Sequence, residues 1–126
     1  MRPLCLSSLL VAGVALGCAH PSPTTVAPEP GERHLANIRQ LTNGGENAEA
    51  YFSADGKRLI FQSTRDGRAC DQEFVMNIDG TGLHRVSNGT GKTTCGFFYA
   101  NDQRILFGSS HAMQQDCPPK PDPSKG

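Results

Sequence analysis

Two ten-residue stretches, Phe52-Ser-Ala-Asp-Gly-Lys-Arg-Leu-Ile-Phe61 and Phe98-Tyr-Ala-Asn-Asp-Gln-Arg-Ile-Leu-Phe107, agree in residue class at nearly every position. They lie 46 residues apart in the chain. A second motif, Arg39-Gln-Leu-Thr-Asn-Gly44, recurs 45 residues later as His84-Arg-Val-Ser-Asn-Gly89. Self-similarity at a period of roughly 20 to 50 residues is typical of solenoids and propellers. The sequence therefore predicts a repeated structural unit of about 45 residues.

Each unit is predicted to consist of short strands joined by tight turns, because alternating and apolar runs are separated by Gly-rich and Asp-rich segments. Strands are expected at 49–53, 58–63, 73–78 and 83–87, then twice within 94–110, after a single strand at 37–42. Asp-Gly pairs favour the positive φ that tight turns need. The residues expected to form turns rather than to bind a ligand are Asp55, Gly56, Asp66, Gly67, Asp79 and Gly80.

These motifs resemble the TolB-type β-propeller repeat. The matching segments are Phe52–Phe61, Ser63-Thr-Arg-Asp-Gly67, Phe74-Val-Met-Asn-Ile-Asp-Gly-Thr-Gly82 and Arg85-Val-Ser87. Departures from the usual repeat are Ala54 in place of proline, Asn101-Asp102 in place of Asp-Gly, and Val86-Ser87 in place of Leu-Thr. The resemblance implies an all-β fold: an incomplete β-propeller of about one and a half four-stranded antiparallel blades, with an orphan N-terminal strand at 37–42.

Propellers close with roughly 4–8 blades, because closure protects the edges of their sheets. The units found here are fewer, so we expect this chain to be the N-terminal part of a longer protein. In circular propellers the N-terminal strand often completes the last blade, so the partners of strand 37–42 are expected beyond residue 126.

Residues 1–17 are typical of an export signal, with Arg2 as their single charge and an apolar run that is too short to span a membrane. The run ends in Val14-Ala-Leu-Gly-Cys18, which resembles the lipobox of bacterial lipoproteins. Cys18 would then receive an acyl anchor. Ala19 in the next position favours the outer membrane. The alternative is a plain signal peptide that releases a soluble periplasmic or extracellular protein.

Four prolines between His20 and Gly31 predict an extended tether over 18–36, because proline blocks helices and sheet ladders. The repeats would occupy 37–117, and 118–126 would be a Pro-rich tail or a truncated loop. Glycine and proline number 14 and 9 of 126 residues, about twice the share of an average protein. This composition suits a turn-rich β protein. Twelve basic and twelve acidic side chains, without a basic cluster, argue against nucleic acid as a partner.

The cysteines after the tether predict a disulfide rather than a metal site, because they lack Cys-x-x-Cys spacing and an exported protein meets oxidising conditions. Three pairings are possible. Cys70–Cys95 is the expected one and Cys95–Cys117 the alternative, which leaves one thiol over.

The sequence contains no complete catalytic motif. Ser87–Thr94 resembles a phosphate loop, but Val86 stands where that motif needs glycine and no helix pattern follows. Gly108-Ser-Ser-His111 places serine and histidine too close in sequence for a relay. We expect no enzyme activity, no cofactor and no metal.

The function expected from the sequence is that of a lipid-anchored envelope protein, held in the membrane through Cys18, that binds an unidentified protein partner. One alternative is the propeller part of a prolyl-oligopeptidase-like peptidase whose catalytic domain lies outside this chain. Another is a truncated gene product without independent function.

Overall fold

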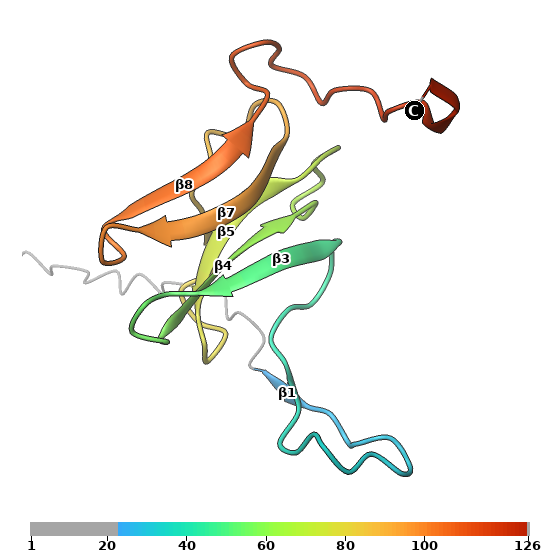
Figure 1. Cartoon of the computed structure of the whole chain (residues 1–126), viewed down its shortest axis with the longest axis vertical. Helices are drawn as coiled ribbons and strands as arrows, with labels where there is room; N and C mark the ends of the chain where they lie inside the picture. The colour runs from blue at the N-terminus through green and yellow to red at the C-terminus, as the bar shows by residue number, and fades with distance from the viewer. Residues whose placement is uncertain (1–22, 126) are drawn as a thin grey trace, which may run out of the picture.

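The computed structural model describes residues 23–125 (Figure 1) and is all-β. It has three antiparallel sheets, none of them closed into a barrel or ring. No helix in this part of the chain is long and apolar enough to cross a membrane. The elements are β1 (Thr24–Thr25), β2 (Arg39–Gln40), β3 (Asn47–Phe52), β4 (Arg58–Ser63), β5 (Gln72–Asn77), β6 (His84–Arg85), β7 (Thr93–Tyr99), β8 (Arg104–Ser109) and the 3-10 turn Pro123–Lys125.

The central sheet is a four-stranded antiparallel meander in the order β3-β4-β5-β6. Its middle strands pair Leu59 with Met76 and Phe61 with Phe74, and these four side chains are buried on one face. The guanidinium of Arg65 lies 5.2 Å from the Phe61 ring centroid and covers part of that face. The predicted strands at 58–63 and 73–78 are therefore present within one residue at each end, and together they form the core.

The opposite face of this sheet is covered by the β7–β8 hairpin, whose strand β7 packs against β3, β4 and β5, while β8 lies farther from the sheet (Figure 1). Ile60 of β4 is fully buried there. A side chain on Gly96 of β7 would meet the Cδ1 atom of Ile60 at 2.9 Å, so the hairpin approaches this closely only because residue 96 is glycine. At the edge, the rings of Tyr51 and Phe97 lie 4.2 Å apart between centroids.

The sequence repeat is also a structural repeat. Hairpins β3–β4 and β7–β8 have the same register, shifted by 46 residues: Phe52 pairs with Leu59, and Phe98 pairs with Ile105. Both first strands contain an irregularity at the same place, where Glu49 and Cys95 have φ values of 52° and 54°. Two copies of one hairpin, including its bulge, are thus packed one on the other.

The expected turn residues all lie in turns. The carboxylate of Asp55 accepts the amide of Lys57 at 3.0 Å, and that of Asp79 accepts the amide of Thr81 at 2.9 Å. Positive φ values between 62° and 82° occur at Gly56, Asp66, Gly67 and Gly80.

The second hairpin turn differs from the first because Asp102 stands where the first has Gly56. Its two carboxylate oxygens accept the amide of Ala54 at 2.9 and 3.0 Å, and Arg58 lies 3.9 Å from one of them. The TolB-type repeat usually has proline at position 54, which has no amide hydrogen to donate. Two of the departures from the repeat pattern, Ala54 and Asp102, therefore form one contact between the two hairpins.

The N-terminal region corrects two expectations. The strand found within 37–42 is β2, and its partner is β1, from the segment predicted to be an extended tether. The amide of Val26 also donates to the carbonyl of Ile38 at 3.0 Å. Three consecutive residues, Thr24 to Val26, keep their amide hydrogens, and all three are β-branched, which explains this short ladder.

Candidate functional site

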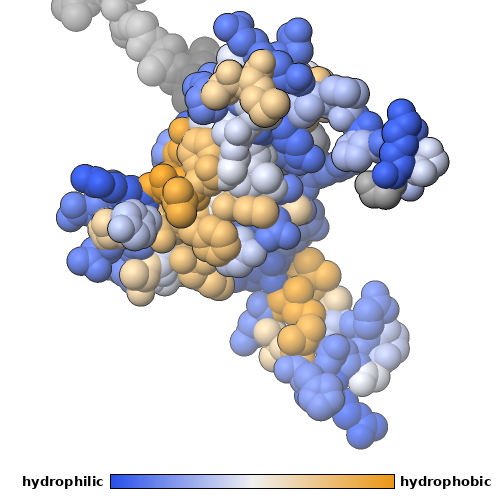
Figure 2. Space-filling model, turned by 45° about the horizontal axis from the view of Figure 1, so that its top comes forward, coloured by the Kyte–Doolittle hydropathy of each residue, from blue (hydrophilic) through white to orange (hydrophobic). Residues whose placement is uncertain are grey.

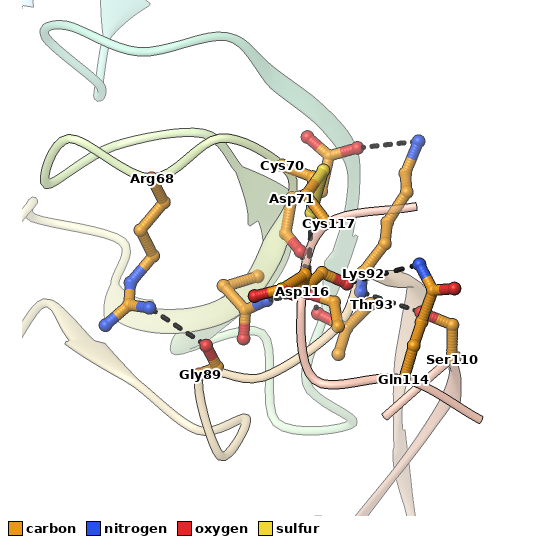
Figure 3. The surroundings of a disulfide bond; sticks show 12 residues. Arg68, Cys70, Asp71, Gly89, Lys92, Thr93, Ser110, Gln114, Asp116 and Cys117 are labelled. Atoms are coloured by element: carbon orange, nitrogen blue, oxygen red, sulfur yellow. Dashed lines mark hydrogen bonds and ion pairs between the residues drawn. A yellow bond between two sulfur atoms is a disulfide. The ribbon is translucent and has the colours of Figure 1, made fainter. Parts of the chain in front are cut away.

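A disulfide joins Cys70 to Cys117, at the end of the sheet where the β4–β5 connection lies (Figure 3). Both expected pairings, Cys70–Cys95 and Cys95–Cys117, are wrong, and Cys95 is an exposed free thiol. Cys95 occupies the bulge of β7, where its amide donates to Gln62 at 3.1 Å. The tail after β8 instead folds back along the β4–β5 loop, which brings Cys117 to Cys70 with Cα atoms 5.7 Å apart.

The tail is fixed at further points. The carbonyl of Gln115 accepts the amide of Gly91 at 2.7 Å, and the hydroxyl of Ser110 accepts the amide of Lys92 at 2.9 Å. The side chain of the buried Gln72 donates to the carbonyl of Gly91 at 2.8 Å. We call the surface formed by residues 64–71, 88–92 and 110–121 the loop face, because three connections far apart in sequence meet there.

Two hollows flank the disulfide on the loop face. The larger has a volume of about 500 Å³, with the disulfide in its wall and the prolines of the tail along one side. The smaller, of about 360 Å³, lies between the 66–72 segment and Gly89, Gly91 and Gln115. Because Cys117–Pro121 line the first hollow, the disulfide decides its shape.

Both signs of charge are present at these hollows. Lys92 forms an ion pair with Asp71, with its Nζ atom 3.2 Å from a carboxylate oxygen, and Glu46 lies along the same hollow. Arg68 lines both hollows and donates to the carbonyl of Gly89 at 3.1 Å (Figure 3). Lys120 adds a positive charge from the tail. Apolar proline walls with mixed charges suit a polypeptide segment better than a simple anion.

Gly91 holds the tail against the loop face, and Gly91→Ala is expected to lower the free energy of unfolding by about 2 kcal/mol. Its φ is 62°, and an added Cβ would lie 2.8 Å from the backbone nitrogen of His111. Gly56→Ala is the matched control, since φ there is 67° but no atom lies within 4 Å of an added Cβ. It should cost only the backbone strain, about 1 kcal/mol. Urea unfolding compares the two variants, and equal losses would contradict a contact role for Gly91.

Two further motifs from the sequence, Ser87–Thr94 and Gly108–His111, lie in a turn and at a strand end. The segment before β7 leads into a strand, and Asn88 closes its turn by accepting the amide of Thr90 at 3.0 Å. The hydroxyl of Ser109 lies 2.7 Å from Nδ1 of His111, but in residues 23–125 no hydrogen bond or ion pair joins His111 to a carboxylate. The described part of the chain contains no group of three or more histidine, cysteine, aspartate or glutamate residues placed to hold a metal ion.

One feature that sequence reasoning missed is Glu73, which is fully buried where β5 meets the β7–β8 hairpin. Neither carboxylate oxygen has a hydrogen-bond partner in the part of the protein described. Burial, together with the charge of Asp71, raises the pKa of Glu73 to about 7, while the nearby amide of Gly96 opposes the rise. A glutamate at the start of a strand carries no sequence signal of burial.

Cys18 and the export signal lie outside the described residues. No protein-family model, curated protein or solved structure matches the chain.

Proposed function

We propose that the chain is a lipid-anchored protein of the bacterial cell envelope, with propeller-type repeats that bind a protein partner through the loop face. It has no catalytic role in this proposal. The observation on which the binding role rests is the covalent attachment of the tail to the β4–β5 loop, because it gives the hollow of about 500 Å³ a fixed wall. A preformed hollow lowers the entropy cost of binding.

The propeller part of the proposal rests on the repeated hairpin. In a propeller each blade packs face to face on the next, and here the second hairpin packs on the face of the first sheet. The four-stranded meander β3-β4-β5-β6 also has the strand order of a propeller blade.

The envelope location is supported by the lipobox-like segment ending in Cys18 and by the Cys70–Cys117 disulfide. Structural disulfides persist in oxidising compartments such as the bacterial periplasm and are rare in the cytosol. The two observations come from different parts of the chain and point to the same compartment.

The anchor is tested by Cys18→Ser. In cells fed a labelled fatty acid, the wild-type chain should take up the label and sediment with membranes, because the thiol of Cys18 is the acyl acceptor. The Cys18→Ser variant should lose both properties. Cys95→Ser is the control, since it removes the exposed thiol and should keep the label. Label retained on the Cys18→Ser variant would rule out this anchor.

The binding surface is tested by photo-cross-linking in cells. A photoreactive residue at Ala69, which is exposed and lines both hollows, should give one discrete adduct with another protein. The same residue at Lys57, exposed in the turn at the other end of β4, should give none. Identical adducts at both positions, or none at Ala69, would count against the loop face.

A further inference from the structure

The carboxyl group of Glu73 lies in the interface between the central sheet and the β7–β8 hairpin. The residue is fully buried, and neither carboxylate oxygen has a hydrogen-bond partner among residues 23–125. A Cβ added at Gly96 of β7 would lie 2.8 Å from the carboxyl carbon of Glu73 and 2.9 Å from Cδ1 of Ile60, so the hairpin closes directly over both side chains. A buried charge without a partner is costly, so the docked hairpin favours the neutral, protonated carboxyl group.

The groups around Glu73 do not compensate a negative charge there. Within residues 23–125 no basic side chain forms an ion pair with Glu73, and its cross-strand neighbour on β4 is the neutral Gln62. The nearby Asp71 disfavours ionisation of Glu73, and the Nζ atom of Lys92 is bound to Asp71 at 3.2 Å. The other titratable or charged groups on this side of the sheet, from β4, β6, β7 and the second hairpin turn, are Arg58, His84, Cys95 and Asp102.

Many of the contacts that hold the hairpin on the sheet are polar. The side-chain oxygen of Gln62 accepts the hydroxyl of Thr94 at 2.6 Å and the amide of Cys95 at 3.1 Å. Apolar side chains of the hairpin are exposed instead, with Tyr99 at 62% and Leu106 at 66%, and Figure 2 shows hydrophobic surface exposed on the main body of the molecule. An element with few buried apolar contacts opens at a lower free energy than the core.

The central sheet has a core that does not depend on the hairpin. All six residues of β4 pair with β5, and the buried side chains of the core lie on the face away from the hairpin. The ends of the hairpin are fixed at the loop face, by the Cys70–Cys117 disulfide after β8 and by the amide of Thr93, which donates to the carbonyl of Asp71 at 2.9 Å. The hairpin can therefore move as a unit while its ends stay attached.

We infer that the β7–β8 hairpin is a proton-controlled flap: release of the proton of Glu73 shifts it from the closed position on the central sheet toward an open position, hinged at the loop face. In the open position water reaches the carboxylate, so its charge is no longer buried. Opening therefore releases a proton, and a rise in pH favours it. The flap goes beyond the proposed function, because it needs neither the acyl anchor nor a bound partner.

The pH range of the flap follows from the same burial. The pKa of Glu73 is raised to about 7 in the closed position and returns to its ordinary value near 4.5 when the group is hydrated. The ratio of open to closed chains should then rise up to tenfold for each pH unit between these two values and level off above about pH 7.

The test measures how fast a buried cysteine reacts with a pyridyl disulfide in the full chain, in detergent and in a Cys95→Ser background. Ile60→Cys places the thiol under the hairpin, and Leu59→Cys places it in the core on the opposite face of the same strand. Opening of the hairpin exposes only residue 60, whereas complete unfolding exposes both positions. At pH 8, Ile60→Cys should react at least about tenfold faster than Leu59→Cys, with the label quantified on the peptide that contains each position.

The role of the proton is tested by adding Glu73→Gln to the Ile60→Cys chain. Glutamine stays neutral, so labelling should slow on the order of 100-fold at pH 8 and only about fourfold at pH 5. Comparing the two chains at one pH cancels the reactivity of the thiol itself. His84→Gln is the matched control, because it removes another group on this side of the sheet that titrates near neutral pH, and it should leave the labelling unchanged.

Three outcomes would overturn the inference. Equal rates for Ile60→Cys and Leu59→Cys would mean that hairpin and sheet open together. Labelling that Glu73→Gln does not slow would separate the flap from this proton, and an equal effect of His84→Gln would assign the pH dependence to the histidine. If Ile60→Cys does not fold, Val75→Cys is the second reporter, since Val75 pairs with Ile60 and is 4% exposed. Acyl labelling and the Ala69 adduct are measured separately, so failure here is distinct from failure of the proposed function.

Discussion

Replacing both Cys70 and Cys117 by serine is expected to lower the free energy of unfolding by about 4 kcal/mol. The disulfide closes a loop with a sequence separation of 47, and that constraint limits the conformations of the unfolded chain. A loss of this size is a large part of the stability of a domain of about 100 residues. Urea unfolding of the oxidised wild type and the double variant measures it.

The matched control for this prediction is Cys95→Ser, which removes a cysteine that forms no bridge. It should leave the urea midpoint nearly unchanged. The double variant should also loosen the tail, so that the backbone amides of residues 110–117 exchange with deuterium faster than in the wild type, because only hydrogen bonds such as those from Gly91 and Lys92 then hold the tail. Equal midpoints and equal exchange in the two proteins would show that the bridge has no structural role.

Glu73→Gln is expected to raise the stability of the chain at pH 8 by about 3 kcal/mol and to change it little near pH 4.5. Burial raises the pKa of Glu73 to about 7 from 4.5, so the folded protein binds a proton that the unfolded chain has released. Stability from this group is therefore fully present below pH 4.5 and is lost as the pH rises to about 7. Glutamine stays neutral and has nearly the same shape.

Unfolding in urea at a series of pH values tests this prediction. The wild type should lose stability between about pH 4.5 and 7, and Glu73→Gln should lose much less. Glu46→Gln serves as the control, since it removes an exposed carboxylate and should follow the wild-type curve. Parallel curves for wild type and Glu73→Gln would mean that the carboxyl group of Glu73 is hydrated or paired in solution.

The two hairpins could be predicted from the sequence because their information is local. Asp55-Gly56 sets the turn of the first hairpin, Asn101-Asp102 stands at the equivalent place in the second, and alternating apolar residues set the strands beside these turns. The 46-residue offset between Phe52 and Phe98 also relates the strand pairing of the two hairpins. It holds for the bulge as well, which lies at Glu49 in the first hairpin and at Cys95 in the second.

The candidate site could not be predicted in the same way. The Cys70–Cys117 pairing depends on the path of the tail after β8, which is fixed by contacts of Gly91 and Lys92 with residues some 20 positions away. Cysteine spacing contains no information about such a path, and it favoured Cys95 in either pairing. The short ladder of β1 with β2 was missed for a related reason, because prolines dominate the composition around Thr24 and Thr25.

The sequence by itself determined an all-β chain, the 46-residue repeat and the turns at Asp55-Gly56 and Asp79-Gly80, because these depend on residues close together along the chain. The tertiary contacts were needed to show that Cys117 joins Cys70, that Glu73 is buried with no hydrogen-bond partner among residues 23–125, and that Leu106 and Phe52 stay exposed. The physical reason is that burial and pairing depend on which surfaces meet, and the same hairpin is covered in one copy and exposed in the next.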